Sequence, residues 1–117
     1  DCPYCRKASE YFKGVENVTR YVFLMPLDIH PDAMRKAQYI LCARDKAGAY
    51  EEAYTGKLDG KEYTVCEDQK AKDLLAEHMT YAKTLNVGGT PSFWINGKNV
   101  VGLNTSLIQN YLRESSN

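Results

Sequence analysis

Two cysteines at the start of the chain have the clearest capacity for chemistry. Cys2 and Cys5 enclose Pro3 and Tyr4. Pro3 suits the first position of a helix, where its missing N–H costs no hydrogen bond. Cysteines with this spacing at a helix start lie about one turn apart on one face, so their sulfurs can close a small disulfide ring. The motif therefore predicts a redox-active centre for thiol–disulfide exchange.

The two thiols are expected to have different roles. Cys2 lies at the positive end of the helix dipole, among unpaired N–H groups that favour a thiolate. Arg6 and Lys7 add positive charge nearby. We therefore expect the pKa of Cys2 to be lowered and Cys2 to be the nucleophile. Cys5 lies further into the helix and is expected to resolve the mixed disulfide that Cys2 forms with a substrate.

A metal site is the main alternative for this motif. A C-x-x-C pair can form half of a zinc site, but such a site needs two further ligands at suitable spacing. The remaining cysteines, Cys42 and Cys66, are isolated, and His30 and His78 stand in no ligand pattern. Redox chemistry is therefore favoured over a metal site, and we expect neither a metal nor a cofactor. His78 is interpreted as a hydrogen-bonded core or boundary residue.

Thr90-Pro91 is the second notable feature, because it follows two glycines and precedes an expected strand. A proline at this position can simply end strand pairing. It can also mark a cis peptide bond. A cis bond would pack Pro91 against the cysteine motif and leave the Thr90 backbone free to pair with an extended substrate segment. The local sequence leaves both interpretations open.

Length and composition indicate one domain. The 117 residues are 44% hydrophobic and 26% charged, which is ordinary for a globular domain with one core. Fifteen basic residues balance fifteen acidic ones, so the charge offers no reason to expect nucleic acid as a partner. No apolar run approaches the roughly 20 residues of a membrane helix. Because the chain opens one residue before a motif cysteine, we expect further sequence upstream.

The elements that must position these residues follow from the sequence pattern. The first helix is expected to run from the cysteine motif to Gly14. The apolar, β-branched segment Val18–Met25 predicts a buried strand. In the helix that follows, Met34, Ala37, Gln38 and Leu41 form the expected inner stripe. The expected helices of this block cover about 30–43, 47–54 and 68–85, the last with Asp68 as its N-cap, and a loop covers 55–64.

The C-terminal part has the pattern of a hairpin and a helix. Residues 92–95 and 98–101 predict two antiparallel strands, because Asn96-Gly97 is a strong hairpin signal. Asn104 or Thr105 is expected to cap the last helix. With one further strand upstream of Asp1, the order becomes β-α-β, helix, β-β-α, an α/β three-layer sandwich. We expect a single domain over 1–117, with a helical insertion over about 30–86.

These residues resemble a known family. Cys-Pro-Tyr-Cys at a helix start, Gly-Gly-Thr-Pro before a strand and an Asn-Gly hairpin are similar to the thioredoxin superfamily. Residues 41–57, with Cys42 and then Cys66, look like the bacterial DsbC proteins, and the resemblance runs to about Arg113. The Pro-Tyr dipeptide is that of DsbG, whereas DsbC has Gly-Tyr. The N-terminal dimerisation domain of these isomerases has no counterpart in this sequence.

The resemblance implies a thioredoxin-like fold, a cis Thr90–Pro91 bond and a structural disulfide between Cys42 and Cys66. From the residues alone, two free buried thiols remain the alternative for the second pair. A disulfide across this loop would stabilise the fold by about 3 kcal/mol. It would also require an oxidising compartment, here the bacterial periplasm after export.

The resemblance further implies a disulfide isomerase or reductase that acts on misoxidised proteins. Cys2 and Cys5 would be catalytic, and Thr90, Pro91 and Tyr4 would bind substrate. A membrane reductant of the DsbD type would keep the protein reduced, and the missing N-terminal domain would form a homodimer. Two alternatives stay open: a DsbA-like oxidase, and a metal-binding or copper-delivery module on the same fold.

Overall fold

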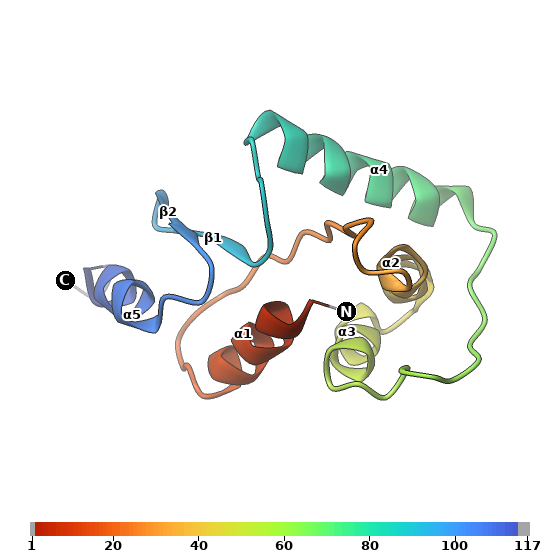
Figure 1. The fold of residues 1–117 in the computed structure, drawn as a ribbon, viewed down its shortest axis with the longest axis horizontal. Helices are drawn as coiled ribbons and strands as arrows, with labels where there is room; N and C mark the ends of the chain where they lie inside the picture. The colour runs from red at the N-terminus through yellow and green to blue at the C-terminus, as the bar shows by residue number, and fades with distance from the viewer. Residues whose placement is uncertain (1, 115–117) are drawn as a thin grey trace. The chain divides into compact units, whose positions relative to one another are not determined.

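The computed structural model describes residues 2–114, which form two compact units. The hairpin unit comprises residues 2–16 and 87–114, and the helical unit comprises residues 17–86. The elements in chain order are α1 (Pro3–Lys13), α2 (Ala33–Cys42), α3 (Lys46–Tyr54), α4 (Gln69–Thr84), β1 (Ser92–Ile95), β2 (Lys98–Val101) and α5 (Thr105–Glu114) (Figure 1).

The hairpin unit is built around β1 and β2, which pair in antiparallel register. Phe93 faces Val100 across this pair. Asn96 and Gly97 both have positive φ, 52° and 84°, which is the backbone that a two-residue hairpin turn requires. The predicted hairpin is therefore confirmed in position and turn.

A small apolar core joins the helices of this unit to its hairpin. Ile108 of α5 is completely buried and Val100 is 2% exposed, and Phe12 of α1 and Ile95 pack with them. The Phe12 and Phe93 ring centroids lie 5.5 Å apart. This packing fixes the direction in which α1 runs, and with it the position of the residues where α1 begins.

The helical unit buries one face each of α2, α3 and α4. Two of these helices begin at capping aspartates, since Asp45 Oδ1 accepts the Gly48 N–H and Asp68 Oδ1 accepts the Lys70 N–H, each at 3.0 Å. The Asp68 cap confirms the predicted start of α4. The core consists of Leu24, Ala37, Ile40, Leu41, Ala49, Ala53, Leu58, Ala71 and Leu75.

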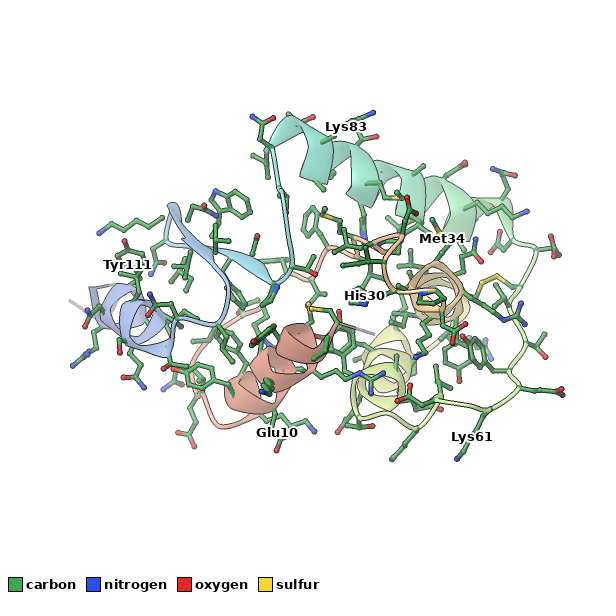
Figure 2. The ribbon with its side chains drawn as sticks, in the orientation of Figure 1. Glu10, His30, Met34, Lys61, Lys83 and Tyr111 are labelled. Atoms are coloured by element: carbon green, nitrogen blue, oxygen red, sulfur yellow. A yellow bond between two sulfur atoms is a disulfide. The ribbon has the colours of Figure 1, made fainter. Side chains whose placement is uncertain are left out.

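The inner stripe of α2 differs from the predicted one. Met34, which is labelled in Figure 2, is 41% exposed, whereas Lys36 is 6% exposed and Ile40 is 5% exposed. Lys36 tolerates this position because its Nζ reaches Asp59 Oδ1 at 2.7 Å while its aliphatic stem packs inward. The predicted stripe, which was based on helical spacing, is correct for the buried Ala37 and Leu41 and wrong for Met34.

The predicted strand over Val18–Met25 is also wrong, because the segment is not part of a sheet. Tyr21 is 84% exposed and Leu24 is 6% exposed. The Leu24 N–H donates to His78 Nδ1 of α4 at 3.1 Å, and the Phe23 ring stacks on His78. β-Propensity describes residues that suit a pleated surface, but a strand still requires a partner for its backbone. In this segment the Leu24 N–H is bonded to the His78 side chain and not to another strand. His78 is thus a partly buried, hydrogen-bonded residue, as the sequence interpretation had it.

Candidate active site

The cysteine motif lies where α1 begins. Cys2 is the N-cap residue, with extended backbone, and its Sγ accepts the Cys5 backbone N–H at 3.2 Å. Pro3 follows at the first helical position. The sulfur thus takes the place that a serine or aspartate oxygen occupies in an ordinary cap. The predicted helix start at the motif is confirmed, and the cap aims an N–H group at the Cys2 sulfur.

The chain folds back so that Thr90 meets Cys2. The Cys2 thiol donates to the Thr90 carbonyl oxygen at 3.5 Å, across 88 positions of sequence. The Thr90–Pro91 peptide bond is cis, and Pro91 is buried. The Gly102 N–H donates to the Pro91 carbonyl oxygen at 2.8 Å, which fastens this loop to the end of the hairpin. The hairpin unit therefore brings Cys2, Cys5 and Thr90 together.

The two thiols of the motif differ in acidity. Burial by itself raises the pKa of Cys2, but hydrogen bonds to the side chains of Cys5 and Thr90 and to backbone groups bring this pKa below its ordinary value. Burial, followed by the hydrogen bond to Cys2, raises the pKa of Cys5 to about 12. At neutral pH, ionisation therefore favours Cys2, and Cys5 keeps its proton. This is the order of acidity that a nucleophile and a resolving thiol require.

Tyr4 differs from the other predicted site residues because its side chain lies at the surface, 61% exposed. Its backbone contributes a hydrogen bond that lowers the pKa of Cys2. Its ring is contacted by Lys7, whose Nζ lies 5.3 Å from the ring centroid. This pair was not predicted, although the spacing of an aromatic residue and a lysine three positions apart on a helix is a usable signal.

The second cysteine pair belongs to the helical unit. Cys42, the last residue of α2, is joined to Cys66 by a disulfide with an S–S distance of 2.04 Å. The segment that carries Cys66 is also held to α2 by the Arg35 Nη2 group, which donates to the Tyr63 carbonyl oxygen at 2.8 Å. This cross-link therefore lies in a region that other contacts already hold in place.

The described residues contain neither a clustered metal-ligand set nor a membrane-spanning helix. Within residues 2–114, no group of three or more His, Cys, Asp or Glu side chains is arranged to hold a metal ion. None of the described helices has the length and apolar character needed to cross a membrane.

Comparisons with known proteins agree on one family. A family model described as a thioredoxin-like domain matches residues 1–112. A probable thiol:disulfide interchange protein DsbC from Bordetella avium is 31% identical over 94 residues, which are 80% of this chain and 31% of that protein. The protein of the same name from Bordetella pertussis is 28% identical over 103 residues, 87% of this chain and 34% of that protein. The chain thus spans about a third of the length of these curated relatives.

A solved structure agrees with the sequence comparisons. The crystal structure of a disulfide interchange protein from Neisseria gonorrhoeae has a TM-score of 0.76 and 28% sequence identity to this chain. The match covers 97% of this chain and 80% of that one. The predicted thioredoxin-like fold class and the resemblance to DsbC are therefore confirmed.

Proposed function

The chain belongs to the thioredoxin-like domain family, and we propose that it is the catalytic domain of a thiol–disulfide oxidoreductase of the DsbC/DsbG type. The proposed reaction is isomerisation or reduction of disulfides in misoxidised proteins. The observation that carries the proposal is the geometry of the motif: Cys2 caps α1, its Sγ accepts the Cys5 N–H at 3.2 Å, and it lies 3.5 Å from the Thr90 carbonyl oxygen. In this setting hydrogen bonds lower the pKa of Cys2, whereas burial raises that of Cys5 to about 12. This difference in pKa supports Cys2 as the attacking thiol and Cys5 as the thiol that later resolves the mixed disulfide.

The first step is attack of the Cys2 thiolate on one sulfur of a substrate disulfide. A bond forms between Cys2 and that sulfur, the substrate S–S bond breaks, and its electron pair leaves on the second sulfur as a thiolate. In isomerisation, another substrate thiolate then attacks the substrate sulfur that is bonded to Cys2. A new substrate disulfide forms and Cys2 leaves as a thiolate, so no net oxidation or reduction occurs.

Reduction uses Cys5 in place of a second substrate thiol. Cys5 loses its proton and attacks the Cys2 sulfur, which forms the Cys2–Cys5 disulfide and releases the substrate as a thiolate that takes up a proton. An external dithiol must then reduce the pair, a role that we assign to a membrane partner of the DsbD type. Burial is the largest cause of the raised Cys5 pKa, and it still disfavours the Cys5 thiolate when Cys2 is bonded to a substrate. This favours isomerisation, because another substrate thiolate can attack the mixed disulfide before Cys5 does.

Thr90, Pro91 and Tyr4 are proposed to bind the substrate chain. In the thiol form, the Cys2 S–H group donates a hydrogen bond to the Thr90 carbonyl oxygen. A Cys2 thiolate, or Cys2 in a mixed disulfide, has no proton to donate, so this oxygen is released at the moment of attack. It can then accept an N–H group from an extended substrate segment, which is pairing by strand addition.

The compartment and assembly are proposed by analogy with the DsbC-type relatives. The Cys42–Cys66 disulfide supports an oxidising location, for which we propose the bacterial periplasm. We further propose that the full-length protein forms a homodimer through an N-terminal domain, which would place two catalytic domains around one substrate.

A refolding assay tests the proposal. The reduced full-length protein is incubated with a small enzyme whose disulfides have been scrambled, and the recovered enzymatic activity is measured. We expect recovery with the wild type and with Cys5→Ser, which retains the attacking thiol, and none with Cys2→Ser. An equilibrium titration against glutathione is the second measurement. A strong oxidant has a reduction potential of about −120 mV. Such a value, combined with no recovery of enzymatic activity, would contradict the isomerase and support a DsbA-like oxidase.

A further inference from the structure

A lysine is held over an aromatic ring at the start of α1. Lys7 Nζ lies 5.3 Å from the centroid of the Tyr4 ring. Tyr4 is 61% exposed and Lys7 is exposed as well, so the pair lies at the surface. The quadrupole of an aromatic ring attracts a cation that lies over its face. The ring thus restrains the ammonium group of Lys7 near the catalytic end of the helix.

The charge of Lys7 has no acidic partner among the described residues. Glu10, labelled in Figure 2, lies three positions further along α1 and could pair with either of two lysines. It pairs with Lys13, with an Nζ–Oε2 distance of 3.7 Å. The first turn of α1 contains no acidic residue. Because the whole chain has a formal net charge of zero, this positive charge is a local feature of the helix start.

The Tyr4–Lys7 pair lies on the turn of helix that follows the reactive sulfur. Tyr4 stands between Cys2 and Cys5 in the motif, and the Cys2 Sγ accepts the Cys5 N–H of this turn at 3.2 Å. The backbone of Tyr4 also helps to lower the pKa of Cys2. A substrate cysteine bonded to Cys2 brings its own neighbouring side chains to this end of α1, which carries the Tyr4 ring and the lysine over it.

We propose that Tyr4 and Lys7 select substrates that carry an acidic side chain next to the cysteine under attack. This inference rests on the proposed function, since it concerns the substrate of the same cysteine. Lys7 would attract the carboxylate, and Tyr4 would be a positioning residue that holds the ammonium group in place. Exposed ion pairs are weak, so we expect an acidic neighbour to raise the exchange rate about 2- to 5-fold over a neutral one. A basic neighbour would lower it by a similar factor.

Peptide disulfides of defined charge test this selectivity. Three short peptides, with Glu, Gln or Lys on both sides of one cysteine, are each joined to glutathione, and their reaction with the reduced full-length protein is followed by chromatography of the released thiols. We expect the rates to fall in the order Glu, Gln, Lys at about 10 mM salt, where the screening length is about 30 Å. The differences should vanish near 1 M salt, where the screening length is about 3 Å.

Variants identify the residues responsible. Lys7→Gln should abolish the rate order and Lys7→Glu should reverse it. Tyr4→Leu should weaken the order although the Lys7 charge remains, whereas Tyr4→Phe should restore it because the ring is retained. Lys83→Gln is the control, since it removes an exposed lysine from the last turn of α4 and leaves the Glu10–Lys13 pair in place, and it should keep both the order and the rates.

The outcomes separate this inference from the proposed function. Equal rates for the three peptides in the wild type, or an unchanged order in Lys7→Gln, overturn the charge selection and leave the oxidoreductase intact. Absence of exchange with every peptide overturns both. A Tyr4→Leu variant with the full wild-type order shows that Lys7 acts without the ring and overturns the positioning role of Tyr4.

Discussion

Cys2 and Cys5 are separated by two residues, lie in one helix start and are free thiols, whereas Cys42 and Cys66 are separated by 24 positions and form a disulfide. Around the first pair, hydrogen bonds distinguish the two thiols, because they lower the pKa of one while burial raises that of the other. Around the second pair, Arg35 and the disulfide hold the same segment to α2. The surroundings of the first pair thus set the pKa values of its two thiols, whereas the contacts around the second pair hold the Cys66 segment against α2.

The largest expected effect is on the first pair. Cys2→Ser should reduce the rate of exchange with a peptide disulfide by about 10³-fold or more, because it removes the sulfur that we propose as the attacking group. The rate is measured by release of the peptide thiol. The double variant Cys42→Ala/Cys66→Ala is the control and should retain most of the rate. Comparable losses in both proteins would contradict the division of roles between the pairs.

Stability should show the opposite pattern. The Cys42→Ala/Cys66→Ala variant should lose about 3 kcal/mol of unfolding free energy, because the unfolded chain is no longer cross-linked. Urea denaturation measures this change. The same comparison made with both proteins fully reduced serves as the control, and there the difference should largely disappear. A cost below about 1 kcal/mol, outside the usual effect of such a cross-link, would mean that Arg35 and the surrounding contacts hold the segment without it.

The pH dependence of alkylation should sharpen the contrast within the first pair. Cys2 should react with a midpoint below the ordinary thiol value, whereas Cys5 should stay largely unreactive until the pH approaches about 12. Cys5→Ala should raise the midpoint of Cys2, because the Cys5 side chain supplies a hydrogen bond that lowers the pKa of Cys2.

The pKa shifts of Cys2 and Cys5 change the free energy of unfolding with pH in opposite directions. A lowered pKa at Cys2 adds stability above its ordinary value, and this contribution is lost as the pH falls through the folded-state pKa. The raised pKa of Cys5 adds stability below the ordinary thiol value, and this contribution is lost as the pH rises toward about 12. Identical alkylation midpoints for the two thiols would contradict both statements.

The smallest expected effects compare the helix caps of the two units. Asn104 Oδ1 accepts the Leu107 N–H at 3.1 Å and caps α5 in the hairpin unit, as Asp68 caps α4 in the helical unit. Asn104→Ala and Asp68→Ala should each lower the unfolding free energy by about 1 kcal/mol. Thermal denaturation measures this loss. Asn104→Asp is the conservative control and should keep most of the stability, since it retains an oxygen that accepts the N–H.

Features that depend on a few neighbouring residues could be predicted from the sequence. The Asn96-Gly97 turn, the Asp68 cap and the helix start at Cys2 are local, because each is decided by backbone geometry and hydrogen bonds within about four residues. The failures were not local. Val18–Met25 has strand propensity but is held by His78, which lies 54 positions after Leu24.

The sequence by itself determined that Cys2 caps a helix and that Cys5 follows one turn later, because Pro3 and the spacing dictate this arrangement. Tertiary structure decided the rest: it placed the Thr90 carbonyl oxygen 3.5 Å from the Cys2 sulfur and buried Cys5 enough to raise its pKa to about 12. The physical reason is that burial and long-range hydrogen bonds exist only after Phe12 and the hairpin have packed together.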